Sequence, residues 1–193
     1  MNGGDILTLW PAVIGPSSRM IPGKIVRFLE QNANMAFAGF RDRHLVPCGS
    51  RVSAWRVHPD RHTITVSLPP PVVHRVIEAM EDNGQFALTV EEHPTHETYQ
   101  LKGRYVGRRG VEAEDLALVT RARERLARTF RMYIPEGIPV DFVMRIMFPD
   151  PEIALDVEID EVFLQTPGPG AGARLYPPVE PEPAEPGANT HVR

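Results

Sequence analysis

Short runs of alternating apolar and polar residues recur along most of the chain. In the last of them, Ile153, Leu155 and Val157 alternate with acidic residues, and the phase slips near Asp160 and Glu161. Such alternation is typical of a strand with one buried face, and a slip in phase indicates a bulge. The predicted strands are Met35–Phe40, Leu45–Val57, Thr63–Leu68, Phe86–Val90, Tyr99–Val106, Val140–Phe148 and Ile153–Leu164.

Three other segments have apolar residues at every third or fourth position. Pro22 opens the first of them, and Asn83 followed by glycine closes the second. Proline is tolerated in a first helical turn, and an Asn-Gly pair commonly ends a helix. The sequence therefore predicts helices over 22–32, 72–84 and Glu112–Phe130.

This order of elements predicts a mainly β protein with flanking helices, built as a small closed antiparallel barrel. We divide the chain into an N-terminal arm (1–20), a barrel domain (21–165), a Gly/Pro-rich strap (166–176) and a tail (177–193). The tail is expected to be disordered, because proline, glycine and glutamate dominate it and it has little apolar surface to bury.

The amino-acid composition limits which classes of partner the protein is expected to bind. The 193 residues are 42% hydrophobic and carry a net charge of -4, which fits one globular core and gives no general basic surface for nucleic acid. The single cysteine, Cys48, excludes an intrachain disulfide and a cysteine-cluster metal site. No apolar run approaches the roughly 20 residues of a membrane-spanning helix. We therefore expect a cytoplasmic protein without nucleic-acid or membrane partners.

Several short motifs follow one another in a recognisable order. Ser50-Arg51-Val52 lies on the second predicted strand, Ser67 ends the third, and a helix then leads to Asp82-Asn83-Gly84 and the strand that begins Phe86-Ala87-Leu88. This order resembles the split-barrel flavin-binding family that includes pyridoxamine 5'-phosphate oxidase. The resemblance covers roughly half of the chain. It implies a split antiparallel β-barrel, an FMN-binding split barrel.

The resemblance also implies site residues. In the family, an arginine on the second strand, a hydroxyl at the end of the third and a basic residue in the next helix help to hold the FMN phosphate. The matching residues are Arg51, Ser67 and Arg75, and Gln100 matches a polar contact to the isoalloxazine ring. The family further implies a homodimer with FMN at the subunit interface and a flavin-dependent redox reaction on a small molecule.

Arg51 and Ser67 suit a phosphate on chemical grounds as well. A guanidinium fork matches phosphate oxygens, and a hydroxyl before a helix adds a donor near the positive end of the helix dipole. In the alternative interpretation, Arg51 pairs with an acid across the sheet and Ser67 caps the helix. Pro69-Pro70-Pro71 lack N–H donors, so they would weaken a phosphate site built on this helix.

Two other functions stay open beside an FMN-dependent oxidoreductase. One is a non-catalytic module that binds or senses haem, flavin or another flat cofactor, for which His74 and His93 are the first haem-ligand candidates. The other is a dimer without cofactor, in which the three prolines close the phosphate site. We assign no catalytic residue.

Two further segments carry candidate chemistry. His93 and His96 lie among glutamates, but a solvated loop is the commoner role of such a cluster, and we assign no metal site. The segment Thr166–Gly172 lacks the strand-to-helix context and the lysine of a nucleotide-binding loop. We expect it to form a strap over the barrel or over a partner subunit.

Overall fold

The computed structural model describes residues 20–31 and 34–177. The predicted arm (1–20) and tail (177–193) lie almost wholly outside these residues, and the domain limits stay predictions. In chain order the elements are α1 (Gly23–Gln31), β1 (Asn34–Arg41), β2 (Pro47–Arg51), β3 (Ala54–Val57), β4 (Thr63–Leu68), the 3-10 helix η2 (Pro70–Val72), α2 (Val73–Asp82), β5 (Gln85–Glu92), β6 (Thr98–Gly110), α3 (Ala113–Phe130), the 3-10 helix η3 (Arg131–Tyr133), α4 (Val140–Met147), β7 (Ile153–Leu164) and β8 (Arg174–Tyr176).

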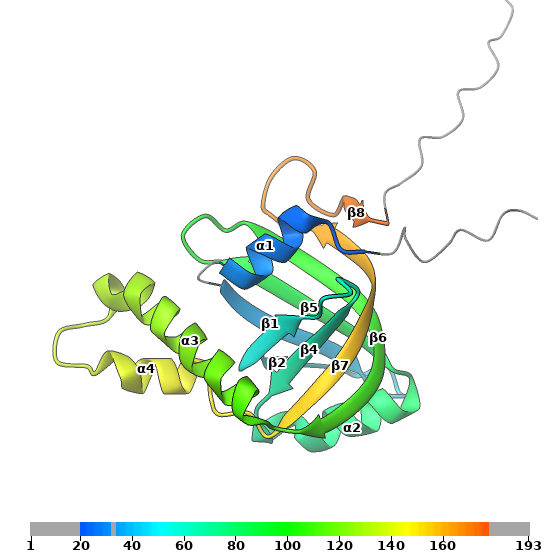
Figure 1. The fold of residues 1–193 in the computed structure, drawn as a ribbon, viewed down its shortest axis with the longest axis horizontal. Helices are drawn as coiled ribbons and strands as arrows, with labels where there is room; N and C mark the ends of the chain where they lie inside the picture. Colours follow the sequence, from blue (N-terminus) through cyan, green and yellow to red (C-terminus); the bar gives the residue numbers. More distant parts are fainter. Residues whose placement is uncertain (1–19, 32–33, 178–193) are drawn as a thin grey trace, which may run out of the picture.

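The strands form one curled antiparallel sheet in the order β2-β1-β5-β6-β7-β4-β3, with β8 beside β7 (Figure 1). The edge strands β2 and β3 are consecutive in the chain and are not paired with each other. Between them, Val52 donates its N–H to Ala36 O (3.0 Å) on β1, and Ser53 donates to Ser67 O (2.9 Å) on β4. The predicted strand over Leu45–Val57 is therefore two strands, and the barrel is split rather than closed. The predicted fold class, a mainly β protein with flanking helices and a split antiparallel barrel, is confirmed.

Two predicted helices cover the ends of this barrel (Figure 1). Phe28 and Leu29 of α1, and Val76 and Met80 of α2, are buried in one core with the inward-facing strand residues. Apolar residues recur every three or four positions in both helices because one side of each faces this core. None of the described helices is long and apolar enough to cross a membrane. Side chains fill the barrel interior, so ligand sites must lie on its outside.

The segment Val140–Met147 is a helix, α4, and its prediction as a strand was wrong. Its polar residues, Asp141 and Arg145, lie four positions apart, a helical spacing that alternation in a strand does not give. One side, with Met144, packs against Leu126 of α3. The α3–α4 hairpin projects from the barrel (Figure 1), which leaves Phe142 and Ile146 on the other side exposed.

The bulge predicted near the end of β7 is present. Lys102 on β6 pairs with Glu161, and the next residue, Gly103, pairs with Ile159, so Asp160 is the extra residue. A Cβ on Gly103 would overlap the backbone of β7. The two strands can approach at the bulge only because this residue has no side chain.

The Gly/Pro-rich segment after β7 turns the chain back onto the same strand. Phe163 of β7 pairs with Arg174 of β8, and Tyr176 is buried. Gly168 and Gly170 in the turn have positive φ angles, which glycine adopts without strain. The strap thus packs on its own barrel.

Candidate functional site

The outer face of β1, β5 and β6, with the neighbouring strand β2, carries two of the predicted site residues. Ala36, Ala38 and Phe40 of β1 are buried in the core, so the residues between them face outward. Directly paired residues of antiparallel strands share a face. The register of the strands therefore gives the neighbours of each outward side chain.

Two of the predicted residues, Arg51 and Gln100, lie in one row across this face. The paired residues in the row are Arg51, Phe37, Thr89, Gln100 and Phe163, which we call the aromatic row. The guanidinium carbon of Arg51 lies 5.4 Å from the centre of the Phe37 ring. Gln100 Nε2 donates to Thr89 Oγ1 at 3.2 Å, which leaves the amide oxygen of Gln100 for a ligand.

A second row lies beside the first and carries small side chains. Its paired residues are Gly49, Gly39, Ala87, Lys102 and Glu161, which we call the small-residue row. A hollow of about 470 Å³ opens over Gly39 and Ala87. Its size falls within the roughly 300–1,000 Å³ typical of ligand sites. Without bulky side chains, a flat group can approach the backbone closely here.

Acidic residues on the rim of the hollow are already paired. Arg104 Nε lies 3.3 Å from Asp160 Oδ2, and Arg174 Nη1 lies 3.3 Å from Glu161 Oε1. These exposed pairs contribute little stability. They do, however, neutralise the carboxylates that would repel an anion.

Cationic side chains that are not paired with acids among the described residues are available near the hollow for an anionic ligand. Lys102 Nζ lies 4.6 Å from the centre of the Phe163 ring, and Arg41 also lines the hollow. Within residues 20–31 and 34–177, neither Lys102 nor Arg51 forms an ion pair. The alternative in which Arg51 pairs with an acid is therefore not observed. Lys102 lines the hollow, whereas Arg51 lies outside its lining on β2; either cation is suited to a phosphate.

The other two predicted residues lie elsewhere. Ser67 is only 1% exposed and pairs with Ala54 and Ala154 on the neighbouring strands. No side chain caps the start of η2, so Ser67 is not a helix cap either. Arg75 is exposed on α2, at one end of the barrel. Arg51 and Gln100 lie on the same face but are separated by β1 and β5, and Ser67 and Arg75 lie elsewhere, so the cofactor contacts of all four residues stay predictions.

His93 and His96 lie on the loop between β5 and β6. His93 stacks on Phe130 of α3 with 4.2 Å between ring centres, and His96 Nδ1 lies 2.7 Å from Glu91 Oε1. No group of three or more His, Cys, Asp or Glu in the described part of the chain could hold a metal ion. The stacking ties the loop to the α3–α4 hairpin.

Sequence analysis did not single out Phe37, Gly39 or Ala87. Small residues at outward positions of neighbouring strands are the signal for the hollow. That signal becomes visible only when the register is known, because one-residue slips move a side chain to the other face.

No family model matches the sequence, and no curated protein matches it. Among solved structures, HupZ of Group A Streptococcus is 15% identical, with 79% of this chain and 100% of that chain covered and a TM-score of 0.47. A putative pyridoxamine 5'-phosphate oxidase from Lactobacillus delbrueckii is 12% identical, with 75% and 94% covered and a TM-score of 0.45. An FMN-binding protein from Syntrophomonas wolfei is 10% identical, with 72% and 80% covered and a TM-score of 0.41.

The split antiparallel barrel that the resemblance implies is present in the strand order and pairing of this chain. At identities of 10% to 15% the likeness concerns the fold alone. The function must therefore be inferred from the residues of this chain.

Proposed function

We propose that the protein binds FMN in the hollow on the outer face of β1, β5 and β6 and acts as a flavin-dependent oxidoreductase on a small molecule. The observation that supports it is one hollow lined by Gly39, Ala87 and Lys102, with Arg51 and Gln100 outside its lining in the next row of outward-facing residues.

The donor set of this face fits FMN. Arg51 would hold the phosphate, since it is cationic and forms no ion pair in the described residues. Lys102 lies three strands away on β6 with its ammonium over Phe163, so it would meet a different part of the ligand. The isoalloxazine ring would lie over Gly39 and Ala87. Gln100 would accept a hydrogen bond from the ring, because Thr89 already fixes its amide nitrogen.

The protein's own contribution is binding and orientation. FMN, when bound, supplies the electron transfer. Arg51 neutralises the phosphate, and the small residues allow ring and backbone to approach without a steric penalty.

An absorption titration tests the proposal. The protein mixed with FMN is expected to retain flavin bands near about 370 and 450 nm after gel filtration. Arg51→Ala should weaken FMN binding about tenfold to a hundredfold, the loss typical of a charge-assisted contact. Arg128→Ala, an exposed arginine on α3, is the control. Protein absorption alone after incubation with FMN would contradict the proposal.

Two further variants locate the site. Gly39→Leu should abolish FMN binding without unfolding the barrel, because a Cβ at Gly39 meets only the Ala87 Cβ at 3.9 Å. Gly107→Leu, where no atom lies within 4 Å, is the matched control. Arg75→Ala should leave the affinity unchanged. A loss with Arg75→Ala equal to that with Arg51→Ala would move the phosphate to the α2 end of the barrel.

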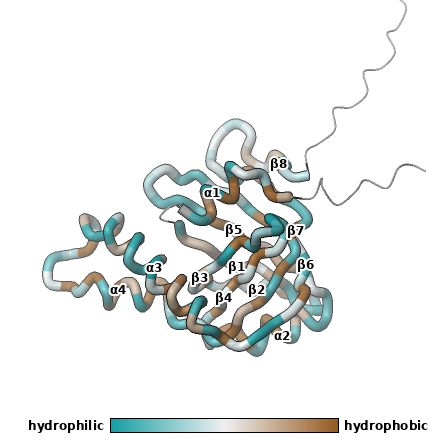
Figure 2. The backbone as a smooth tube through the Cα atoms, viewed as in Figure 1, coloured by the Kyte–Doolittle hydropathy of each residue, from teal (hydrophilic) through white to brown (hydrophobic). Residues whose placement is uncertain are grey.

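We also propose that the protein is a homodimer in which the second copy covers the hollow. Among residues 20–31 and 34–177, those that line the hollow form a floor and a rim and do not enclose it. Phe37 beside it is 41% exposed, and the projecting α3–α4 hairpin carries hydrophobic positions, also visible in Figure 2. The exposed large apolar residues of this hairpin are Met132, Tyr133, Ile138, Phe142 and Ile146. Apolar surface of this extent usually marks an interface.

Light scattering after gel filtration tests the dimer. The wild type should have twice the chain mass of 21.6 kDa, and Phe142→Glu should shift it to the single-chain mass. Thr120→Glu, an exposed change on α3, should remain dimeric. If Phe142→Glu is monomeric and binds FMN as tightly as the wild type, the second copy does not cover the hollow.

A further inference from the structure

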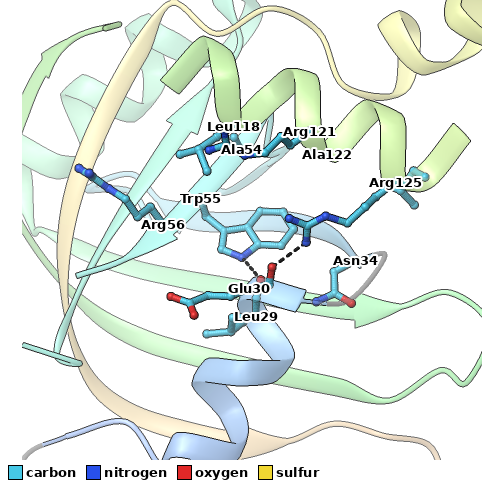
Figure 3. Close-up of a pocket in the computed structure, with 11 residues that line it drawn as sticks. Leu29, Glu30, Asn34, Ala54, Trp55, Arg56, Leu118, Arg121, Ala122 and Arg125 are labelled. Carbon is cyan, nitrogen blue, oxygen red and sulfur yellow. Dashed lines mark hydrogen bonds between the residues drawn. The ribbon is translucent and has the colours of Figure 1, made fainter. Parts of the chain in front are cut away.

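A separate cavity of about 250 Å³ lies between α1, β3 and α3 (Figure 3). It shares no lining residue with the hollow over Gly39 and Ala87. The indole of Trp55 lies in the middle of this cavity, with Arg125 above it and Ala122 on the facing side of α3 (Figure 3). Because the cavity is smaller than the roughly 300–1,000 Å³ of drug-sized ligand sites, it suits a single small ring system.

Hydrogen bonds hold the walls of the cavity in place. Three successive carbonyls at the end of α1 accept from side chains of other elements: Asn34 Nδ2 donates to the Phe28 carbonyl at 2.7 Å, Trp55 Nε1 to the Leu29 carbonyl at 3.0 Å, and Arg125 Nη1 to the Glu30 carbonyl at 2.6 Å. These contacts satisfy carbonyls that the helix end leaves without partners. They also fix the indole, so its face is preformed for stacking.

Two buried polar atoms at this cavity lack partners. Asn34 is 3% exposed, and its Oδ1 has no hydrogen-bond partner among the described residues. Arg56 Nε also has no hydrogen-bond partner among the described residues, and Arg56 Nη1 lies 2.7 Å from Glu114 Oε2. A buried acceptor without a donor is costly, and native proteins rarely leave one unmatched.

The mouth of the cavity is cationic. Its lining includes three arginines, Arg56, Arg121 and Arg125, and one carboxylate, that of Glu30. Arg121 is exposed and has no ion pair within the described residues. A guanidinium above an aromatic floor selects a ligand that is flat and apolar in its body and anionic at one end.

We propose that this cavity binds a small aromatic carboxylate. The ring stacks on Trp55, and the carboxylate meets Arg121. The site uses none of the residues assigned to FMN, so either proposal can fail while the other stands.

Tryptophan fluorescence of the full chain tests this site. The chain has two tryptophans, so Trp10→Phe leaves Trp55 as the reporter. Titration with 4-hydroxybenzoate should change the emission of Trp55 in a saturable way. Its neutral counterpart, 4-hydroxybenzyl alcohol, should bind at least about tenfold more weakly, because it has no charge for Arg121.

Variants on α3 separate this site from unspecific binding. Ala122→Leu fills the cavity and should abolish the saturable change, whereas Ala113→Leu, an exposed position of the same helix, should not. Arg121→Gln should weaken binding about fivefold to tenfold, and Arg128→Gln should have no effect. The proposal is overturned by an absence of saturation, by equal affinity for the acid and the alcohol, or by a signal that persists in Ala122→Leu.

Discussion

Gly103→Ala is expected to prevent the chain from folding stably, with a loss of about 3 kcal/mol or more in the free energy of unfolding. An added Cβ would overlap the carbonyl oxygen of Glu158 and lie 2.9 Å from its carbonyl carbon and 3.0 Å from Ile159 Cα. All three atoms belong to the backbone of β7, a central strand between β6 and β4. The strand cannot withdraw without breaking its own ladder. Soluble yield and urea unfolding measure the effect.

Gly107→Ala is the matched control, because it lies on the same strand and its added Cβ meets no atom within 4 Å. Its free energy of unfolding should stay within about 1 kcal/mol of the wild type. Equal behaviour of the two variants would show that β6 and β7 do not approach at the bulge as described.

The sequence predicted the strands whose two faces differ in polarity. Thr63–Leu68 was predicted to the residue, and the slip near Asp160 located the bulge, because both follow from local alternation. The break at Val52 and Ser53 could not be predicted, since it depends on which strand each half pairs with. For α4, the short length of eight residues and the high share of apolar residues favoured a strand, although Asp141 and Arg145 keep the helical spacing of four.

The candidate site shows the same limit. The resemblance supplied Arg51 and Gln100, and only the register revealed that they share a row with Phe37. The orientation of Ser67 could not be predicted either, because its burial results from neighbours on two other strands. Pairing between strands that are distant in the chain depends on the whole sheet. A single sequence therefore predicts which side of each strand is buried, but not which strand lies beside it.

Asp115→Asn is expected to lower the free energy of unfolding by about 2–3 kcal/mol at neutral pH. Asp115 is 1% exposed and accepts from Arg109 Nη1 at 2.5 Å and from Arg109 Nη2 at 3.0 Å. It also accepts the backbone N–H of Glu112 at 2.9 Å in the capping box of α3. The carboxylate thus joins the end of β6 to the start of α3, and its neutral replacement leaves the Arg109 charge poorly matched. Glu114→Gln is the control, since the Glu114 side chain is 55% exposed and its pair with Arg56 should contribute less than about 1 kcal/mol.

The stability difference between the wild type and Asp115→Asn should depend on pH in one direction. The hydrogen bonds from Arg109 hold the pKa of Asp115 below its ordinary value of 3.8. A carboxyl group whose pKa is lowered by folding stabilises the protein fully above its ordinary pKa, and this contribution disappears as the pH falls through the pKa of the folded state. The wild type should therefore keep its advantage from about pH 7 to about pH 5 and lose it progressively below about pH 4. Urea unfolding of both proteins at several pH values measures the difference, and an advantage that grows toward low pH would contradict the assignment of the Asp115 charge.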